Sequence, residues 1–282
     1  MKLGLVLEGG ASRTLFSCGV MDALLENKIY ADYVIGVSAG IAYGVSYASG
    51  QIGRNLQVSA YMSDKRYMGF KHMLNPKNRS YYNMNFVFEE IPNSLVHFDF
   101  DAFAAYPGRV VAVVTNLETG EPEYIDVPRN DSFFKLIEAS CALPVMFQPI
   151  EIDGKMYMDG GISDSIPYRR ALDEGCDKLI TILTREKSYI KTDEQGASLA
   201  KLMYKNNPEF LKAIETRPKQ YNDSRSSLFE YSEKSGAIVI MPEDTTGFKR
   251  TESDYDKLKK LYDDGYNTAQ KMMPQIIEYL NS

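Results

Sequence analysis

The chain has 282 residues, of which 44% are hydrophobic and 25% charged, a composition typical of a globular protein with one domain, or one domain and an appendage. Its net charge of −6, with no basic stretch to offset it, argues against nucleic acid as a partner. No run of 18 apolar residues is present, and Glu8 interrupts the short apolar start, so we expect neither a membrane-spanning helix nor a signal peptide.

The three cysteines are few, odd in number and irregularly spaced, which indicates free thiols in a reducing, cytoplasmic setting. We expect Cys18, Cys141 and Cys176 to be buried as small apolar residues. None has a partner at the spacing of metal ligands, so no metal site is expected.

The first forty residues predict a strand–helix–strand unit. Residues 2–7 form a short apolar, β-prone run that ends in a glycine turn, and residues 14–27 keep apolar side chains at helical spacing. A second apolar run follows at residues 33–37. Because parallel strands joined by a helix build sheets that are covered on both faces, we expect an α/β fold.

The glycine turn has the sequence Gly9-Gly10-Ala11-Ser12-Arg13. It matches neither a dinucleotide-binding turn nor a Walker loop, so we expect no cofactor. Adjacent glycines after a first strand do supply backbone amides that are free to point at an oxyanion. Two roles stay open for Arg13: it neutralises a phosphate, or it anchors the loop.

The second glycine motif, Gly36 to Gly40, has the pattern Gly-x-Ser-x-Gly between a predicted strand and a helix of small residues that ends near Ser49. This is the context of a nucleophile elbow, in which a tight turn projects the Ser38 hydroxyl at the end of the sheet. The amide of Ala39 complements the glycine-turn amides in an oxyanion hole. A plain glycine-rich strand–helix connection is the alternative.

Residues 50–106 are the least regular stretch. Eleven aromatic residues lie between Tyr61 and Tyr106, about twice the average density of the chain. Basic residues are interleaved with them: Lys65, Arg66, Lys71, Lys77 and Arg79. Two interpretations stay open, a cap or lid that contacts acyl chains or a membrane surface, and a helical subdomain with its own core. The two histidines, His72 and His97, also lie here, without metal-binding spacing.

Sheet structure resumes at residues 109–116, a β-branched run typical of a central strand, with residues 123–126 beside it. A helix from about Asp131 to Ser140 and a hairpin turn at 152–155 precede a strand that ends at Asp159-Gly160-Gly161. Catalytic side chains gather at strand ends in α/β sheets, so Asp159 is a candidate, with a plain tight turn as the alternative. A helix at 167–174 and a strand at 178–184 follow.

Four motifs now stand in one order, and together they resemble those of the patatin-like phospholipases, lipid acyl hydrolases with a Ser–Asp dyad. They are the glycine turn with its arginine, the elbow, the Ala-Ser-x-Ala-x-Pro-x-x-Phe-x-Pro segment at 139–149, and the Asp-Gly-Gly motif. The resemblance covers about residues 3–184. This chain departs from it where the family loop commonly has glycine, at Ala11 and Thr14.

The resemblance implies a three-layer sandwich with a mostly parallel sheet, in which Ser38 is the nucleophile and Asp159 its proton acceptor. It also implies that amides near Gly9, Gly10 and Ala11 form the oxyanion hole. The order of residues separately favours a two-residue site, because an α/β-hydrolase triad needs a histidine after the acid and none follows His97. Burial near Ser38 is expected to raise the pKa of Asp159.

The last hundred residues are less regular. Residues 186–233 are polar, with helical fragments near 199–203 and 210–214, whereas residues 236–241 predict a strand and residues 253–280 a helix bent at Pro274. The economical division is a catalytic core at 1–184, with the insertion at about 50–106, and a mostly helical extension at 185–282 packed on the core.

Three function classes stay open. The first is a serine acyl hydrolase of phospholipids or related lipids, located in the cytoplasm with peripheral contact at the inner face of the membrane. The second is a small-ester or thioester hydrolase with the same site and no lipid interface. The third is a catalytically silent lipid-binding protein that keeps the fold.

Overall fold

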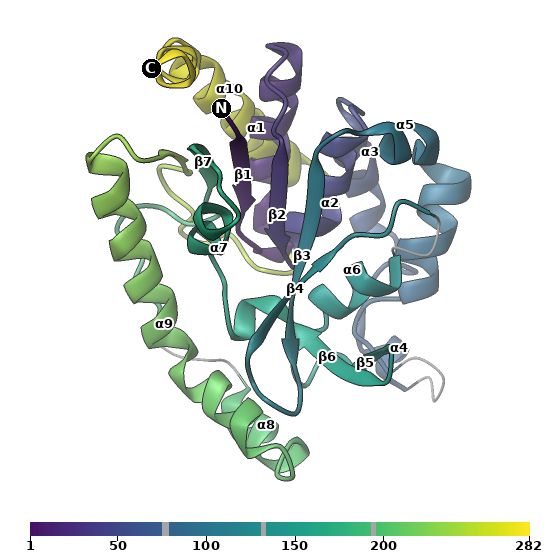
Figure 1. Cartoon of the computed structure of the whole chain (residues 1–282). Helices are drawn as coiled ribbons and strands as arrows, with labels where there is room; N and C mark the ends of the chain where they lie inside the picture. The colour runs from purple at the N-terminus through teal and green to yellow at the C-terminus, as the bar shows by residue number, and fades with distance from the viewer. Residues whose placement is uncertain (75–78, 131–133, 193–195) are drawn as a thin grey trace.

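The computed structural model describes residues 1–74, 79–130, 134–192 and 196–282. Within these residues, an eight-stranded sheet lies at the centre of the molecule (Figure 1). The strand order is β5-β6-β3-β2-β1-β7-β8, and β4 pairs with β3 off this path. The strands are β1 (Leu3–Leu7), β2 (Tyr33–Val37), β3 (Arg109–Asn116), β4 (Pro122–Asp126), β5 (Ile150–Ile152), β6 (Lys155–Asp159), β7 (Lys178–Ile182) and β8 (Ile238–Ile240). These strands confirm the predicted ones to within one or two residues at most ends.

The centre of the sheet is parallel: β1 pairs with β2 and β7, β2 with β3, and β7 with β8. The edge that carries β4, β5 and β6 is antiparallel. Every residue of β1 and β2 is buried, because helices cover both faces of these continuous apolar runs. The mostly parallel three-layer arrangement is therefore confirmed.

One helical layer consists of α1 (Leu15–Glu26), α2 (Ala39–Ala48), α6 (Phe134–Ser140) and α10 (Tyr255–Asn281). The opposite face is covered by α7 (Tyr168–Asp173) and α9 (Pro208–Glu233), as Figure 1 shows. Helices α1 and α10 cross at Gly19 and Gly265. A Cβ atom at either glycine would lie 2.0 Å from a carbonyl oxygen of the other helix, so only glycine permits this approach.

The insertion at 50–106 consists of short helical segments: α3 (Arg54–Ser59), η2 (Ala60–Ser63), α4 (Phe70–Met73), the π-helix η3 (Phe86–Leu95) and α5 (Phe100–Ala105). Most of its aromatic side chains are buried or half-buried, and Phe70 is exposed. The insertion is therefore helical, as one interpretation predicts, but its buried side chains share the hydrophobic core of the sheet and its helices and form no separate core among the described residues. Lys77, like the predicted helix start at Asp131, lies outside the described residues.

The extension contains α8 (Ala197–Met203), the continuous α9, β8 and α10. The prediction of short fragments around 210–214 was wrong, because α9 extends over 26 residues. Its buried residues form only a narrow stripe (Phe210, Ala213, Ile214, Tyr221, Arg225 and Leu228), so polar residues dominate its sequence. Helix α10 passes through Pro274 without a break, and the bend expected there stays a prediction. Within the described ranges, no helix combines the length and apolar character needed to cross a bilayer.

Candidate active site

Ser38 lies in a strained turn between β2 and α2. Its φ of 52° and ψ of −130° fall outside the regions that non-glycine residues ordinarily occupy. A Cβ atom at Gly36 would lie 2.7 Å from the amide nitrogen of Ile41, and one at Gly40 would lie 2.6 Å from the carbonyl oxygen of Leu7. Both glycines are therefore required by packing, and the predicted elbow geometry is present.

Ser140 holds this turn from the side. The Ser38 amide donates to Ser140 Oγ at 2.9 Å, and Ser140 Oγ donates to the carbonyl oxygen of Val113 at 2.7 Å. The end of α6 is thereby tied to the nucleophile turn and to β3. Sequence reasoning noted Ser140 only as part of a motif, since nothing local shows that its hydroxyl satisfies an amide 102 residues away.

The glycine turn packs directly against the elbow. A Cβ atom at Gly9 would lie 2.8 Å from the carbonyl oxygen of Val37 and 2.9 Å from Ser38 Cβ. Within the described part of the chain, the amides of Gly9, Gly10 and Ala39 donate no hydrogen bond. They are therefore available to an oxygen atom bound beside Ser38.

The two departures from the family loop differ in consequence. Ala11 has a φ of 49°, in the left-handed region that favours glycine, so its side chain imposes backbone strain. Thr14 has an ordinary helical φ of −66° and is fully buried at the start of α1. Only the first departure therefore has a conformational cost.

Asp159 ends β6 and is 1% exposed. Its Oδ1 accepts from the amide of Gly161 at 2.8 Å, and its carbonyl oxygen accepts from Thr115 Oγ1 at 2.8 Å. A Cβ atom at Gly160 would lie 2.2 Å from the carbonyl oxygen of Val113, which explains the glycine after the aspartate. Oδ2 is buried and has no hydrogen-bond partner among the described residues, so this oxygen is available to a further donor.

Burial raises the pKa of Asp159, whereas the charge of Arg217 and contact with the Ser38 hydroxyl lower it less strongly. The net direction is upward, as the sequence predicts. No direct hydrogen bond joins Ser38 Oγ to the carboxyl group in this structure, but the two side chains are close enough to interact and line the same cavity.

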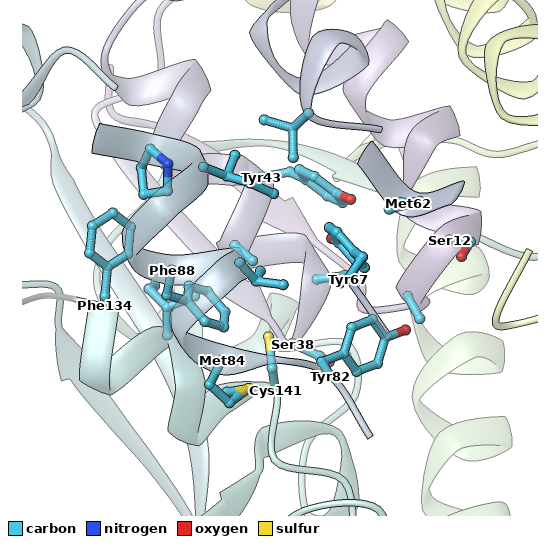
Figure 2. Close-up of a pocket in the computed structure, with 18 of the residues that line it drawn as sticks. Ser12, Ser38, Tyr43, Met62, Tyr67, Tyr82, Met84, Phe88, Phe134 and Cys141 are labelled. Atoms are coloured by element: carbon cyan, nitrogen blue, oxygen red, sulfur yellow. The ribbon is translucent and has the colours of Figure 1, made fainter. Parts of the chain in front are cut away.

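Ser38 lies at the junction of two cavities. The first, of about 120 Å³, is lined mainly by apolar side chains of the insertion and α2, with two further residues from α6 (Figure 2). Tyr67, Tyr82 and Phe88 surround it from the insertion. Cys141 contributes its side chain beside Ser38, so it is only half-buried and the prediction that all three cysteines are buried was wrong for this one. Cys141 directly follows Ser140, the last residue of α6, and lines this pocket.

The second cavity is larger, about 770 Å³, and polar. It brings together most of the predicted site: Gly9, Gly10, Ala11, Arg13, Ser38, Asp159 and Gly161. It also contains residues that sequence reasoning missed, chiefly Arg185, Arg217 and Arg250, because they lie far along the chain in a region without motifs.

Neither histidine is part of the site. His97 is exposed, and neither His97 nor His72 lines a cavity that contains Ser38. Among the described residues, no group of three His, Cys, Asp or Glu side chains is placed to hold a metal ion.

The fold and the site define an α/β protein with a strained elbow serine beside a buried aspartate. The sequence profile of the patatin-like phospholipase family matches residues 5–172, more than half of the chain, and the chain belongs to this family. A second profile, a domain of unknown function (DUF6363), matches residues 207–281. The family is described as one of phospholipases, a class of enzymes that act on lipid esters.

Individual relatives are distant. The uncharacterised protein YjjU of Escherichia coli K12 is 26% identical over 65% of this chain and 52% of its own length. The lysophospholipase NTE1 of Meyerozyma guilliermondii is 27% identical over 64% of this chain and 12% of its own length, so the match spans about half of one relative and a small part of the other. Among solved structures, VipD from Legionella pneumophila is similar in fold, with a TM-score of 0.51, 16% identity, and coverage of 97% of this chain and 67% of VipD.

Proposed function

We propose that this protein is a serine acyl hydrolase that cleaves acyl ester bonds of phospholipids or related lipids. The observation that carries the proposal is the meeting of an apolar pocket and a polar cavity at Ser38, since a lipid ester joins an apolar chain to a polar headgroup. The acyl chain would occupy the pocket under the insertion, and the headgroup would lie in the larger cavity.

In this mechanism Ser38 Oγ attacks the ester carbonyl and Asp159 accepts its proton, directly or through one water molecule. The amides of Gly9, Gly10, Ala11 and Ala39 stabilise the oxyanion. Protonated Asp159 then gives the proton to the leaving alcohol. In the second half, water attacks the acyl-Ser38 ester, Asp159 accepts its proton, and that proton returns to Ser38 Oγ as the carboxylic acid is released. The glycines of the three motifs support the geometry of these groups, and Arg13 contributes a positive charge beside them.

The proposal also includes a catalytic core at residues 1–184, an extension at 185–282 and a cytoplasmic protein that touches the membrane peripherally. Exposed apolar side chains support that contact: Phe70, Leu74, Ile190, Leu199, Leu202 and Met203. Turnover is expected to rise when a short-chain phospholipid passes from monomers to micelles. Equal rates on both forms would favour the small-ester alternative.

The decisive test compares the wild type with Ser38→Ala on phospholipid micelles, and labels both with a fluorophosphonate. Loss of a nucleophile typically lowers kcat on the order of 10⁴-fold or more, and labelling should disappear. Ser94→Ala, at an exposed position of the insertion, is the matched control and should behave as wild type. Ser38→Ala retaining more than a tenth of the activity would contradict the serine-hydrolase mechanism. Absence of both activity and labelling in the wild type would favour the lipid-binding alternative.

A further inference from the structure

The larger cavity beside Ser38 is strongly cationic, although the chain as a whole carries a net charge of −6. Of the described residues that line it, two are carboxylates, Glu8 and Asp159, and six are cations: Arg13, Arg185, Lys191, Arg217, Lys249 and Arg250. Charge of one sign concentrated in a concave site raises the local concentration of ligands with the opposite charge.

Five of the six cations come from the part of the chain after residue 184, and Arg13 alone lies in the segment that matches the patatin-like profile. Hydrogen bonds hold the two parts together at this point. The Ser12 amide donates to the carbonyl oxygen of Arg250 at 3.1 Å, and Ser12 Oγ donates to that of Glu252 at 2.8 Å. Arg185 donates to Thr245 Oγ1 at 2.8 Å, so hydrogen bonds hold Arg185 and the backbone of Arg250 in place.

Two of the guanidinium groups form no direct ion pair among the described residues, and the buried carboxylates Glu8 and Asp159 act on them only through space. Within the described ranges, Arg13 and Arg250 make no side-chain hydrogen bond or ion pair with protein. Arg13 is only 8% exposed, and its Nε is buried without an acceptor. Burial and repulsion from Arg185 and Arg250, opposed in part by attraction to Glu8, lower its pKa to about 10, so it stays cationic at neutral pH. A buried, unpaired charge costs free energy that a bound anion would offset.

The two carboxylates do not neutralise this cluster. Glu8 accepts from Tyr221 OH at 2.7 Å and from the amide of Thr184, so its oxygens are engaged in joining α9 to the glycine turn. Even with Asp159 ionised, as the proposed mechanism requires, the two carboxylates offset only two of the six cations that line the cavity. The cavity therefore presents net positive charge next to the nucleophile.

We propose that this cavity binds the phosphate of a substrate headgroup with net negative charge, and that the C-terminal extension supplies the selecting cations Arg250 and Lys249. The inference rests on the proposed acyl-hydrolase function and gives the extension a role in it. The protein then prefers anionic over zwitterionic acyl glycerophosphates, and added salt weakens that preference.

The test measures kcat/KM for lysophosphatidic acid and lysophosphatidylcholine with the same acyl chain, and compares their ratio among variants of the full chain. Arg250→Gln should lower the anionic-to-zwitterionic ratio about tenfold, as expected for one lost charge-assisted phosphate contact. Lys249 is exposed, so Lys249→Gln should lower the anionic-to-zwitterionic ratio by a smaller factor. Any change in the strength of Asp159 as a base affects both substrates alike and cancels in the ratio. The matched control, Arg169→Gln on the exposed side of α7, should leave the ratio unchanged.

A second arm titrates inorganic phosphate into wild type and Arg250→Gln by calorimetry, which needs no turnover. Phosphate binding that Arg250→Gln weakens supports the anion site even if no ester is cleaved, and in that case only the acyl-hydrolase proposal fails. Wild type that cleaves both lipids equally and binds no phosphate overturns the inference. Phosphate binding without any headgroup preference overturns the assignment to the substrate, since the cations then bind free phosphate.

Discussion

The insertion at 50–106 and the extension after residue 184 approach the same serine with different side chains. The insertion contributes mainly aliphatic and aromatic residues to the small pocket, whereas the extension contributes arginines and lysines to the large cavity. In the family-matched core, the glycine turn, the elbow and β6 carry the groups that we assign to the reaction itself. Under the proposed function, the insertion would mainly select the acyl chain and the extension would mainly select the headgroup, although Arg250 also lines the small pocket and Phe70 the large cavity.

The largest effect should come from a change at the reaction centre itself, which leaves the small pocket and the large cavity intact. Asp159→Asn keeps the shape of the side chain and removes the base, so kcat/KM should fall about 10³–10⁴-fold on every ester, with headgroup and chain-length preferences preserved. The kcat/KM of the Ser38→Ala/Asp159→Asn double variant should be only slightly lower than that of either single variant. The His72→Gln/His97→Gln protein should stay within a few fold of wild type. Loss of activity there, with Asp159→Asn near wild type, would contradict the dyad.

The same group sets the acid limb of the pH profile. A base must be ionised, and the pKa of Asp159 lies above its ordinary value of 3.8, so activity should fall as the pH drops through that raised pKa. The measurement is kcat/KM against pH on a neutral ester. A rate that stays constant down to pH 4 would show that no group with a raised pKa acts as the base.

The assignment of the acyl chain to the small apolar pocket can be tested by filling part of that pocket. Val87→Phe, at a half-buried position that lines the pocket, should exclude about two methylene groups, which at about 0.8 kcal/mol each lowers the long-to-short chain preference about tenfold. Ile52→Phe, at an exposed position of the same insertion, is the control. The headgroup ratio should not move in either variant. A Val87→Phe protein with a changed anionic-to-zwitterionic headgroup ratio and an unchanged long-to-short chain ratio would contradict the assignment of the acyl chain to the small pocket.

The attachment of the extension to the core can be weakened at one oxygen. Tyr221→Phe removes the 2.7 Å hydrogen bond to buried Glu8, and the free energy of unfolding should fall by about 1.5–3 kcal/mol. Tyr30→Phe, at an exposed tyrosine, should leave it unchanged. Urea denaturation gives both values. Equal stability of the two variants would mean that this contact does not couple the extension to the glycine turn.

The smallest effect concerns Ala11. Glycine would release about 1–2 kcal/mol of left-handed strain, against about 0.4–1 kcal/mol of added entropy in the unfolded chain, so Ala11→Gly should be stabilising by about 1 kcal/mol or less. Ala104→Gly, on the exposed side of α5, should be destabilising by about 0.5–1 kcal/mol. Thermal or urea unfolding of both proteins checks the opposite signs. Destabilisation in both would show that the positive φ of Ala11 imposes no strain.

The sequence by itself determined the turns that carry Ser38 and Asp159, because each turn lies within a few residues of a required glycine. Gly36, Gly40 and Gly160 each lie against backbone atoms that a side chain would displace, so their positions mark the turns where Ser38 and Asp159 had to lie. Apolar runs marked the strands for a similar reason, since a sheet covered on both faces excludes polar residues. Short-range sterics and burial therefore predict the fold and the proposed dyad.

Tertiary structure alone decided what surrounds that dyad. Ser140 reaches the Ser38 amide from 102 residues away, and Tyr221 reaches Glu8 from 213 residues away. Five of the six cations of the large cavity gather from α9 and two loops, the one after β7 and the one after β8, in a stretch where the sequence shows only a polar surface. Hydrogen bonds and electrostatic fields depend on distance in space and not on distance along the chain, so no local pattern could reveal them.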